Sequence, residues 1–78
     1  MNESIELLKK KAQYYFEKKQ AVHITLQNRE FYNGNMIKCE ADFILMDVWD
    51  KGEIPVFFIE IFDIEIYTAR VEDGNNEV

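Results

Sequence analysis

Residues 21–48, AVHITLQNREFYNGNMIKCEADFILMDV, decide the fold of this chain. Apolar and polar residues alternate over residues 22–26, which is the period-two pattern of a half-buried β-strand. The polar segment 27–30 interrupts the pattern, and a second strand is expected over residues 31–40. Gly34 lies inside that strand, where glycine marks a bulge, a sharp bend or a close approach of two backbones. The stretch predicts the beginning of a small, strongly curved antiparallel sheet.

The rest of the chain predicts a helix before this stretch and more strands after it. Apolar residues recur at three- and four-residue spacing over residues 3–19, which indicates an amphipathic helix with one buried stripe. Residues 43–49 are mostly apolar and fit a central strand. After a short hairpin turn with glycine, residues 54–59 and 63–70 are expected to form the last two strands. The fold class expected is all-β with an N-terminal α-helix.

The length of 78 residues allows one domain. We expect this domain to cover residues 1–71, with the helix at about residues 3–19 and the strands over about residues 21–71. Residues 72–78 are acidic and rich in turn formers, and we expect them to be a disordered tail. A chain this short with 47% hydrophobic residues has more apolar surface than a small domain readily buries, which favours association.

The net charge of −6 is distributed unevenly along the chain. Residues 1–38 hold seven Lys and Arg against four acids, a balance of +3, and residues 39–78 hold two against eleven, a balance of −9. A phosphate backbone is repelled by the second half, so nucleic-acid binding would have to use the first. Opposite charges on the two halves could instead assist the packing of subunits.

The composition supports no catalytic or metal-binding function. Cys39 is the only cysteine, which excludes an intramolecular disulfide and a Cys-rich zinc cluster, and His23 is the only histidine. We therefore expect no enzymatic activity, no metal and no cofactor. No apolar run approaches the roughly 18 residues of a membrane span, and the first residues lack the order of a signal peptide. We expect a cytoplasmic protein without a membrane partner.

Residues 26–34, LQNREFYNG, resemble the opening of the first Sm motif. They hold a strand-ending Leu26, Asn28 two places on, an aromatic residue, and Gly34 eight places after the leucine. Residues 41–47 look like the third strand of the same motif, so the resemblance to the Sm-like (LSm/Hfq-type) family covers nearly the whole chain. It implies a five-stranded, strongly bent antiparallel barrel behind the helix, with another small barrel, of SH3 or OB kind, as the alternative.

The turn after the first strand departs from the Sm pattern. Many Sm-like proteins carry a glycine at the position of Arg29. Either the turn differs in detail, or Asn28 takes the positive-φ conformation that asparagine tolerates.

The resemblance also implies binding of single-stranded RNA in RNA processing or regulation. The bases would contact the loops between strands two and three and between strands four and five, while Arg29 and the N-terminal lysines would contact phosphates. Carboxylates stand at Glu40 and at Glu60, where relatives have an aspartate and a cation respectively. The alternative is therefore a protein-interaction or scaffold module that has lost the RNA pocket. The RNA-binding candidates are Arg29, Glu40, Asp42, Phe43, Glu60, Phe62 and Asp63.

Sm-like domains pair the edges of strands four and five between neighbouring subunits, which implies a homo-oligomeric ring. From the family's habit we expect about five to eight subunits. The last two strands also supply apolar side chains that one small barrel would not bury. The interface candidates are Phe57, Phe58, Ile59, Ile64 and Ile66, with Phe62 beside them.

Overall fold

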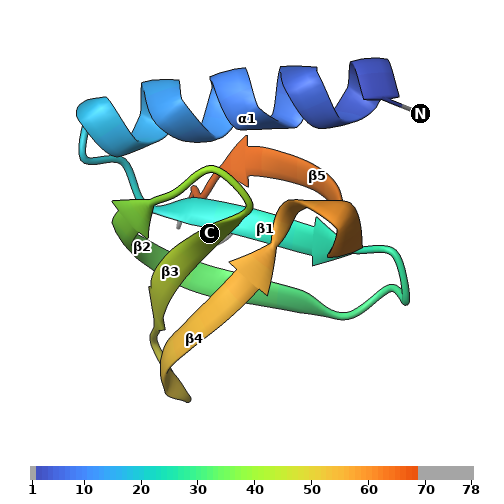
Figure 1. Ribbon diagram of the computed structural model, residues 1–78. Coiled ribbons are helices and arrows are strands. Elements are labelled where there is room, and N and C mark those ends of the chain that lie inside the picture. The colour runs from blue at the N-terminus through green and yellow to red at the C-terminus, as the bar shows by residue number, and fades with distance from the viewer. Residues whose placement is uncertain (1, 69–78) are drawn as a thin grey trace, which may run out of the picture.

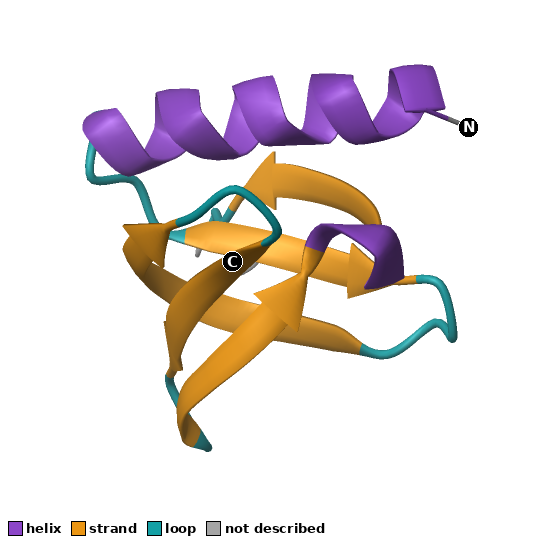
Figure 2. Ribbon diagram, viewed as in Figure 1, coloured by secondary structure: helices purple, strands orange, loops and turns teal. Residues whose placement is uncertain are grey.

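The computed structural model describes residues 2–68, in which one helix precedes five strands (Figure 1). The helix ends at Glu17, two residues before the predicted end, and a 3₁₀ turn, η1, replaces the end of the predicted fourth strand. Figure 2 shows the helix lying across one side of the strands. The expected boundary at residue 71 and the expected tail lie outside the described residues. The elements are α1 (Asn2–Glu17), β1 (Val22–Leu26), β2 (Phe31–Cys39), β3 (Phe43–Val48), β4 (Gly52–Phe57), η1 (Phe58–Glu60) and β5 (Ile61–Ile66).

The strands form one antiparallel sheet in the order β4-β3-β2-β1-β5, which confirms a mostly β fold with an N-terminal helix. No pairing among the described residues joins β4 to β5, because η1 carries the chain from one edge strand to the other. Over residues 2–68 the sheet is therefore not closed into a barrel, and the barrel of the Sm resemblance stays a prediction. A short turn at residues 49–51 connects β3 to β4, where the alternative OB fold would have a helix.

One hydrophobic core lies between α1 and the inner face of the sheet. Leu8 and Ala12 of the predicted helical stripe are buried, and Ile5 and Tyr15 pack against the core from the same face. The strands supply the remaining buried residues at every second position of β1 and β3, as the alternation predicts. These buried strand and η1 residues are Val22, Ile24, Leu26, Ile44, Met46, Val48, Val56, Phe58, Ile61 and Ile64.

Gly34 sits where β2 approaches β3 most closely. A Cβ atom at this position would overlap the carbonyl oxygen of Asp47 and lie 3.0 Å from the Cα of Val48. Any side chain would therefore collide with the neighbouring backbone, which is why the strand requires glycine here. The register with β3 shifts shortly afterwards, between Met36 and Lys38. The sequence left a bulge, a sharp bend and a close approach open at Gly34, and the structure shows the close approach at Gly34 itself with the register shift just after it.

The end of α1 places Lys19 in the left-handed conformation, with φ 58°. The N–H of Gln20 donates to the carbonyl of Tyr15 at 3.0 Å, and the N–H of Lys19 donates to the carbonyl of Phe16 at 3.1 Å. This pair of hydrogen bonds is the Schellman motif, in which the left-handed position is usually glycine. The chain then turns back to enter β1.

Candidate functional site

The two loops that the Sm resemblance assigns to RNA lie side by side. The Glu40 N–H donates to the carbonyl of Phe43 at 2.9 Å and closes the loop between β2 and β3. The Phe58 N–H donates to the carbonyl of Asp42 at 3.0 Å, so the same loop is tied to η1. A hollow of about 420 Å³ opens beside them, lined by Ile5, Lys9, Ala41, Asp42, Phe57, Phe58 and Ile59.

The chemistry of this end of the molecule is mainly acidic. Glu40, Asp42 and Glu60 are all exposed. Phe43 is half-buried, and its ring lies 5.3 Å from that of Phe57, so part of its surface is already covered. Within the hollow, Lys9 is the cation that α1 contributes. The two loops therefore supply carboxylates and a partly covered ring where RNA would need cations and open stacking surfaces.

Phe62 and Asp63, the remaining candidates in this region, lie in different surroundings. Phe62 is 66% exposed. Asp63 Oδ1 accepts hydrogen bonds from Lys11 Nζ and from the Ile64 N–H, both at 2.9 Å. Partial burial opposes ionisation of the carboxyl, but these hydrogen bonds and the Lys11 charge outweigh it and lower the pKa of Asp63. Asp63 therefore links β5 to α1.

Arg29 lies in the β1–β2 turn and itself takes the positive φ, at 75°. Of the two alternatives left open for this turn, the structure shows the one in which the turn differs in detail: Asn28 has no positive φ, and its side chain accepts a hydrogen bond from the Glu30 N–H at 3.0 Å. Arg29 lines a groove together with Phe31 and Lys51. None of the β2–β3 loop or η1 candidates lines that groove, although the turn is tied to η1 by the Gln27 N–H, which donates to the carbonyl of Glu60 at 2.8 Å.

The interface candidates divide into two groups. Phe57, Ile59 and Ile66 are exposed at or beside the two edge strands, with Ile59 73% exposed. Phe58 and Ile64 are 2% and 0% exposed, because η1 turns Phe58 inward and Ile64 pairs with Ile24 on the core side of β1. These two side chains are part of the core and are not available to another subunit.

Exposed aromatic side chains on β2 and after β3 were not assigned a role from the sequence. Phe31 is 57% exposed and its ring lies 5.2 Å from that of His23, while Trp49 is 51% exposed and its ring lies 4.9 Å from that of Tyr67. The alternation of polar and apolar residues over residues 22–26 indicates only that the polar side chains lie on the face of β1 opposite to the core. The contact between residues 49 and 67 depends on the fold and has no local signal.

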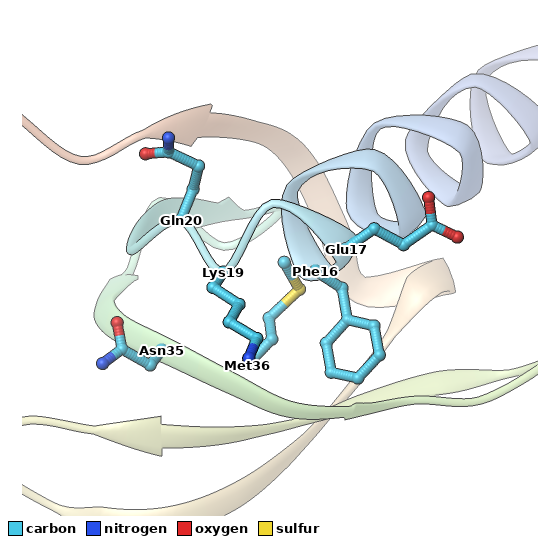
Figure 3. A pocket seen from close by; sticks show the side chains of 6 residues that line it. All are labelled: Phe16, Glu17, Lys19, Gln20, Asn35 and Met36. Carbon is cyan, nitrogen blue, oxygen red and sulfur yellow. The ribbon is translucent and has the colours of Figure 1, made fainter.

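A second unassigned feature is a hollow of about 440 Å³ at the C-terminal end of α1. Figure 3 shows the Phe16, Lys19 and Met36 side chains converging on it, with Gln20 and Asn35 on its border. Lys19 reaches the hollow from its left-handed backbone position. The two positive-φ cations, Lys19 and Arg29, therefore each line a surface depression.

No family model matches the chain, and comparison with curated proteins finds no match. Among residues 2–68, no group of three or more His, Cys, Asp or Glu side chains is arranged to hold a metal ion. The helix that the structure describes is neither long nor apolar enough to cross a membrane. Cys39 is half-buried, and burial, followed by the nearby Glu40 charge, raises the pKa of its thiol.

Proposed function

We propose that the chain is the subunit of an Sm-like ring that associates with single-stranded RNA. The observation that carries the proposal is the pair of open strand edges. Among the described residues β4 pairs only with β3, and β5 only with β1, so each keeps one unpaired row of backbone N–H and C=O groups. Such edges are templates for pairing with another chain.

The side chains around these edges are the second support for assembly. Phe57 and Ile66 are exposed on the edge strands, and Ile59 and Phe62 are exposed between them. Large apolar side chains exposed beside unpaired strand edges favour contact with another protein. Pairing β4 of one copy with β5 of the next is a head-to-tail contact, which closes into a ring when the rotation permits.

The Arg29 groove supports association with RNA. Arg29 and Lys51 can pair with phosphates, and the exposed Phe31 ring in the same groove offers a face on which a base can stack, although Glu30 also lines the groove. Lys9 adds a cation next to the β2–β3 loop. The negative net charge of each subunit opposes these contacts, so binding should be weak and should fall steeply as salt is added.

Assembly is tested by sedimentation velocity on the full chain and on three matched variants. Ile59→Glu and Ile66→Glu place a charge beside the open edges and should reduce the assembled mass. Leu7→Glu, at an equally exposed apolar side chain on the outer side of α1, should leave the assembled mass unchanged. A wild-type chain that sediments as a monomer at about 100 µM would overturn the ring.

RNA association is tested by titrating labelled oligo(U) and oligo(A) at about 50 mM and about 200 mM salt. Arg29→Gln should weaken binding several-fold, and Phe43→Ala tests the loop pocket separately. Lys18→Gln, which removes a cation at the end of α1, is the matched control. Absence of binding at the lower salt would refute RNA association.

A protein-interaction or scaffold module is the second candidate function. The specific observation in its favour is the acidic end formed by Glu40, Asp42 and Glu60, where the resemblance places the RNA pocket. Assembly without RNA binding in the two experiments above would select this function.

A further inference from the structure

The outer face of the sheet carries two pairs of aromatic rings connected through one asparagine. Trp49 and Tyr67 meet edge to face, with their ring planes at 89°. The His23 ring rests against Phe31, and its Nδ1 lies 2.6 Å from Asn33 Oδ1. The Trp49 N–H donates to the Asn33 carbonyl at 3.1 Å. Asn33 therefore contacts His23 through its side chain and Trp49 through the backbone.

The strand register places carboxylates on this same face. His23 is opposite Glu65 on β5, and Asp47 on β3 is opposite Glu53 on β4. Residues opposite each other in an antiparallel sheet project from the same side, and the core residues at alternate positions project from the other. All three carboxylates are exposed. They therefore project from the same, solvent-facing side of the sheet as His23.

These carboxylates have no cationic partner among residues 2–68, where the only ion pair is that between Lys11 and Asp63. Asp47 and Glu53 are directly opposite each other on the neighbouring strands β3 and β4, and like charges in that position are destabilising. A cation bound between them would relieve the repulsion. The sheet face thus combines exposed aromatic side chains with carboxylates that no ion pair among residues 5–68 neutralises.

We propose that this face binds a basic, arginine-containing segment of another protein. A guanidinium group stacks on the faces of Trp and Tyr rings and pairs with carboxylates through two parallel hydrogen bonds. Single-stranded nucleic acid also stacks on aromatic rings, but its phosphates would be repelled by the three carboxylates. Charge complementarity therefore selects a basic polypeptide as the occupant. We call this surface the aromatic–acidic face, comprising His23, Asp47, Trp49, Glu53, Glu65 and Tyr67.

The sequence provides a direct reporter, because Trp49 is the only tryptophan of the chain. A short oligo-arginine peptide added to the full chain should change Trp49 fluorescence in a saturable way. An oligo-lysine peptide of equal length should bind several-fold more weakly, because an ammonium group cannot stack or form a two-pronged hydrogen bond. A glycine–serine peptide should give no change.

Variants then distinguish the contribution of the rings and carboxylates to peptide binding from the general attraction of a basic peptide to an acidic protein. With a fluorescent oligo-arginine peptide, Trp49→Leu and Tyr67→Leu should each weaken binding about three- to tenfold. Glu65→Gln and Asp47→Asn should each weaken it about two- to fivefold. Tyr14→Leu and Glu6→Gln, on the exposed side of α1, are matched controls that should bind as the wild type does. Circular dichroism establishes that each variant is folded.

Two results would overturn the proposal. If the folded Trp49→Leu and Tyr67→Leu variants bind the peptide with wild-type affinity, the rings do not contribute and the net charge of the chain alone attracts the peptide. An oligonucleotide that quenches Trp49 while the oligo-arginine peptide does not would assign the face to nucleic acid. The proposal concerns a surface apart from the open strand edges, so it is decided independently of ring assembly.

Discussion

Gly34 in β2 differs from Lys19, after α1, and Arg29, in the β1–β2 turn, in why its backbone conformation matters. Gly34 is not in the left-handed region, and glycine is needed there only because a side chain would collide with β3. Lys19 and Arg29 do lie in the left-handed region, at φ 58° and 75°, yet neither is glycine. Glycine is thus present where space demands it, and lysine and arginine stand where the backbone alone would favour it.

Packing alone determines the residue type at position 34, whereas positions 19 and 29 tolerate a side chain that can serve another purpose. A collision with the neighbouring backbone has no inexpensive solution, so Gly34 is dictated by the fold. A non-glycine residue in the left-handed region costs only about 1 kcal/mol. Both rim cations line depressions on the surface, beside Phe31 in one case and beside Phe16 in the other. A role of these two side chains in binding a ligand would explain why glycine does not occupy the two positions.

The largest effect expected is that of Gly34→Ala. The added Cβ overlaps the Asp47 carbonyl, so β2 and β3 must separate, and unfolding free energy should fall by about 3 kcal/mol or more. Asn35→Ala, at the next and exposed position, should stay within about 0.5 kcal/mol of the wild type. Urea denaturation at a fixed chain concentration measures both. Equal stability of the two variants would mean that the strands do not approach as closely as described.

Arg29→Gly should have a smaller effect of opposite sign on stability. Its φ of 75° lies beyond the usual left-handed range, so glycine should raise the unfolding free energy by about 1 kcal/mol. The same change should weaken oligonucleotide binding, because the cation beside Phe31 is lost. Arg29→Asn, which tolerates positive φ, should fall between the two in stability. A destabilised Arg29→Gly variant would contradict the assignment of strain to this turn.

Lys19→Gly should stabilise less, by about 0.5 kcal/mol, because φ 58° is close to the left-handed minimum. Lys18→Gly removes the same charge one residue earlier, where the Schellman motif does not require the left-handed conformation, and should not stabilise. Thermal unfolding of the two variants gives the difference. If both changes act alike, the effect comes from charge and not from backbone conformation.

Local sequence patterns predicted the elements, since alternation and helical spacing depend on near neighbours, and they marked Gly34 as a bulge, a bend or a close approach. They placed the fourth strand's end too late, because the 3₁₀ turn that buries Phe58 resembles a continued apolar strand. Ile64 was assigned to an interface for a related reason. An apolar residue on an edge strand can face the core or a partner, and only its register with Ile24 decides which.

The candidate sites were harder to predict than the fold. The Sm resemblance placed the two RNA-binding loops together, but it did not predict that Arg29 lines a groove beside Phe31 and Lys51. The Trp49–Tyr67 contact joins segments far apart in the chain, so it exists only once the sheet is bent. Likewise, positive φ at Arg29 could not be inferred while Asn28 was the better candidate on residue type.

The smallest effect on stability is expected for the partly exposed ion pair between Lys11 of α1 and Asp63 of β5. Asp63 has a lowered pKa in the folded chain, so its contribution is present above the pKa of an unfolded aspartate and is lost as pH falls through the folded pKa. Both side chains are more than a third exposed, which limits the contribution to about 0.2–1 kcal/mol. Asp63→Asn keeps an acceptor for the Ile64 N–H, so near neutral pH it should lose only this amount. The loss should vanish once the pH falls below the lowered pKa of Asp63 in the folded chain, and Lys11→Gln should reproduce it without adding to it in the double variant. A loss that grows on acidification would mean that Asp63 is stabilised in its protonated form, opposite to the geometry at Lys11.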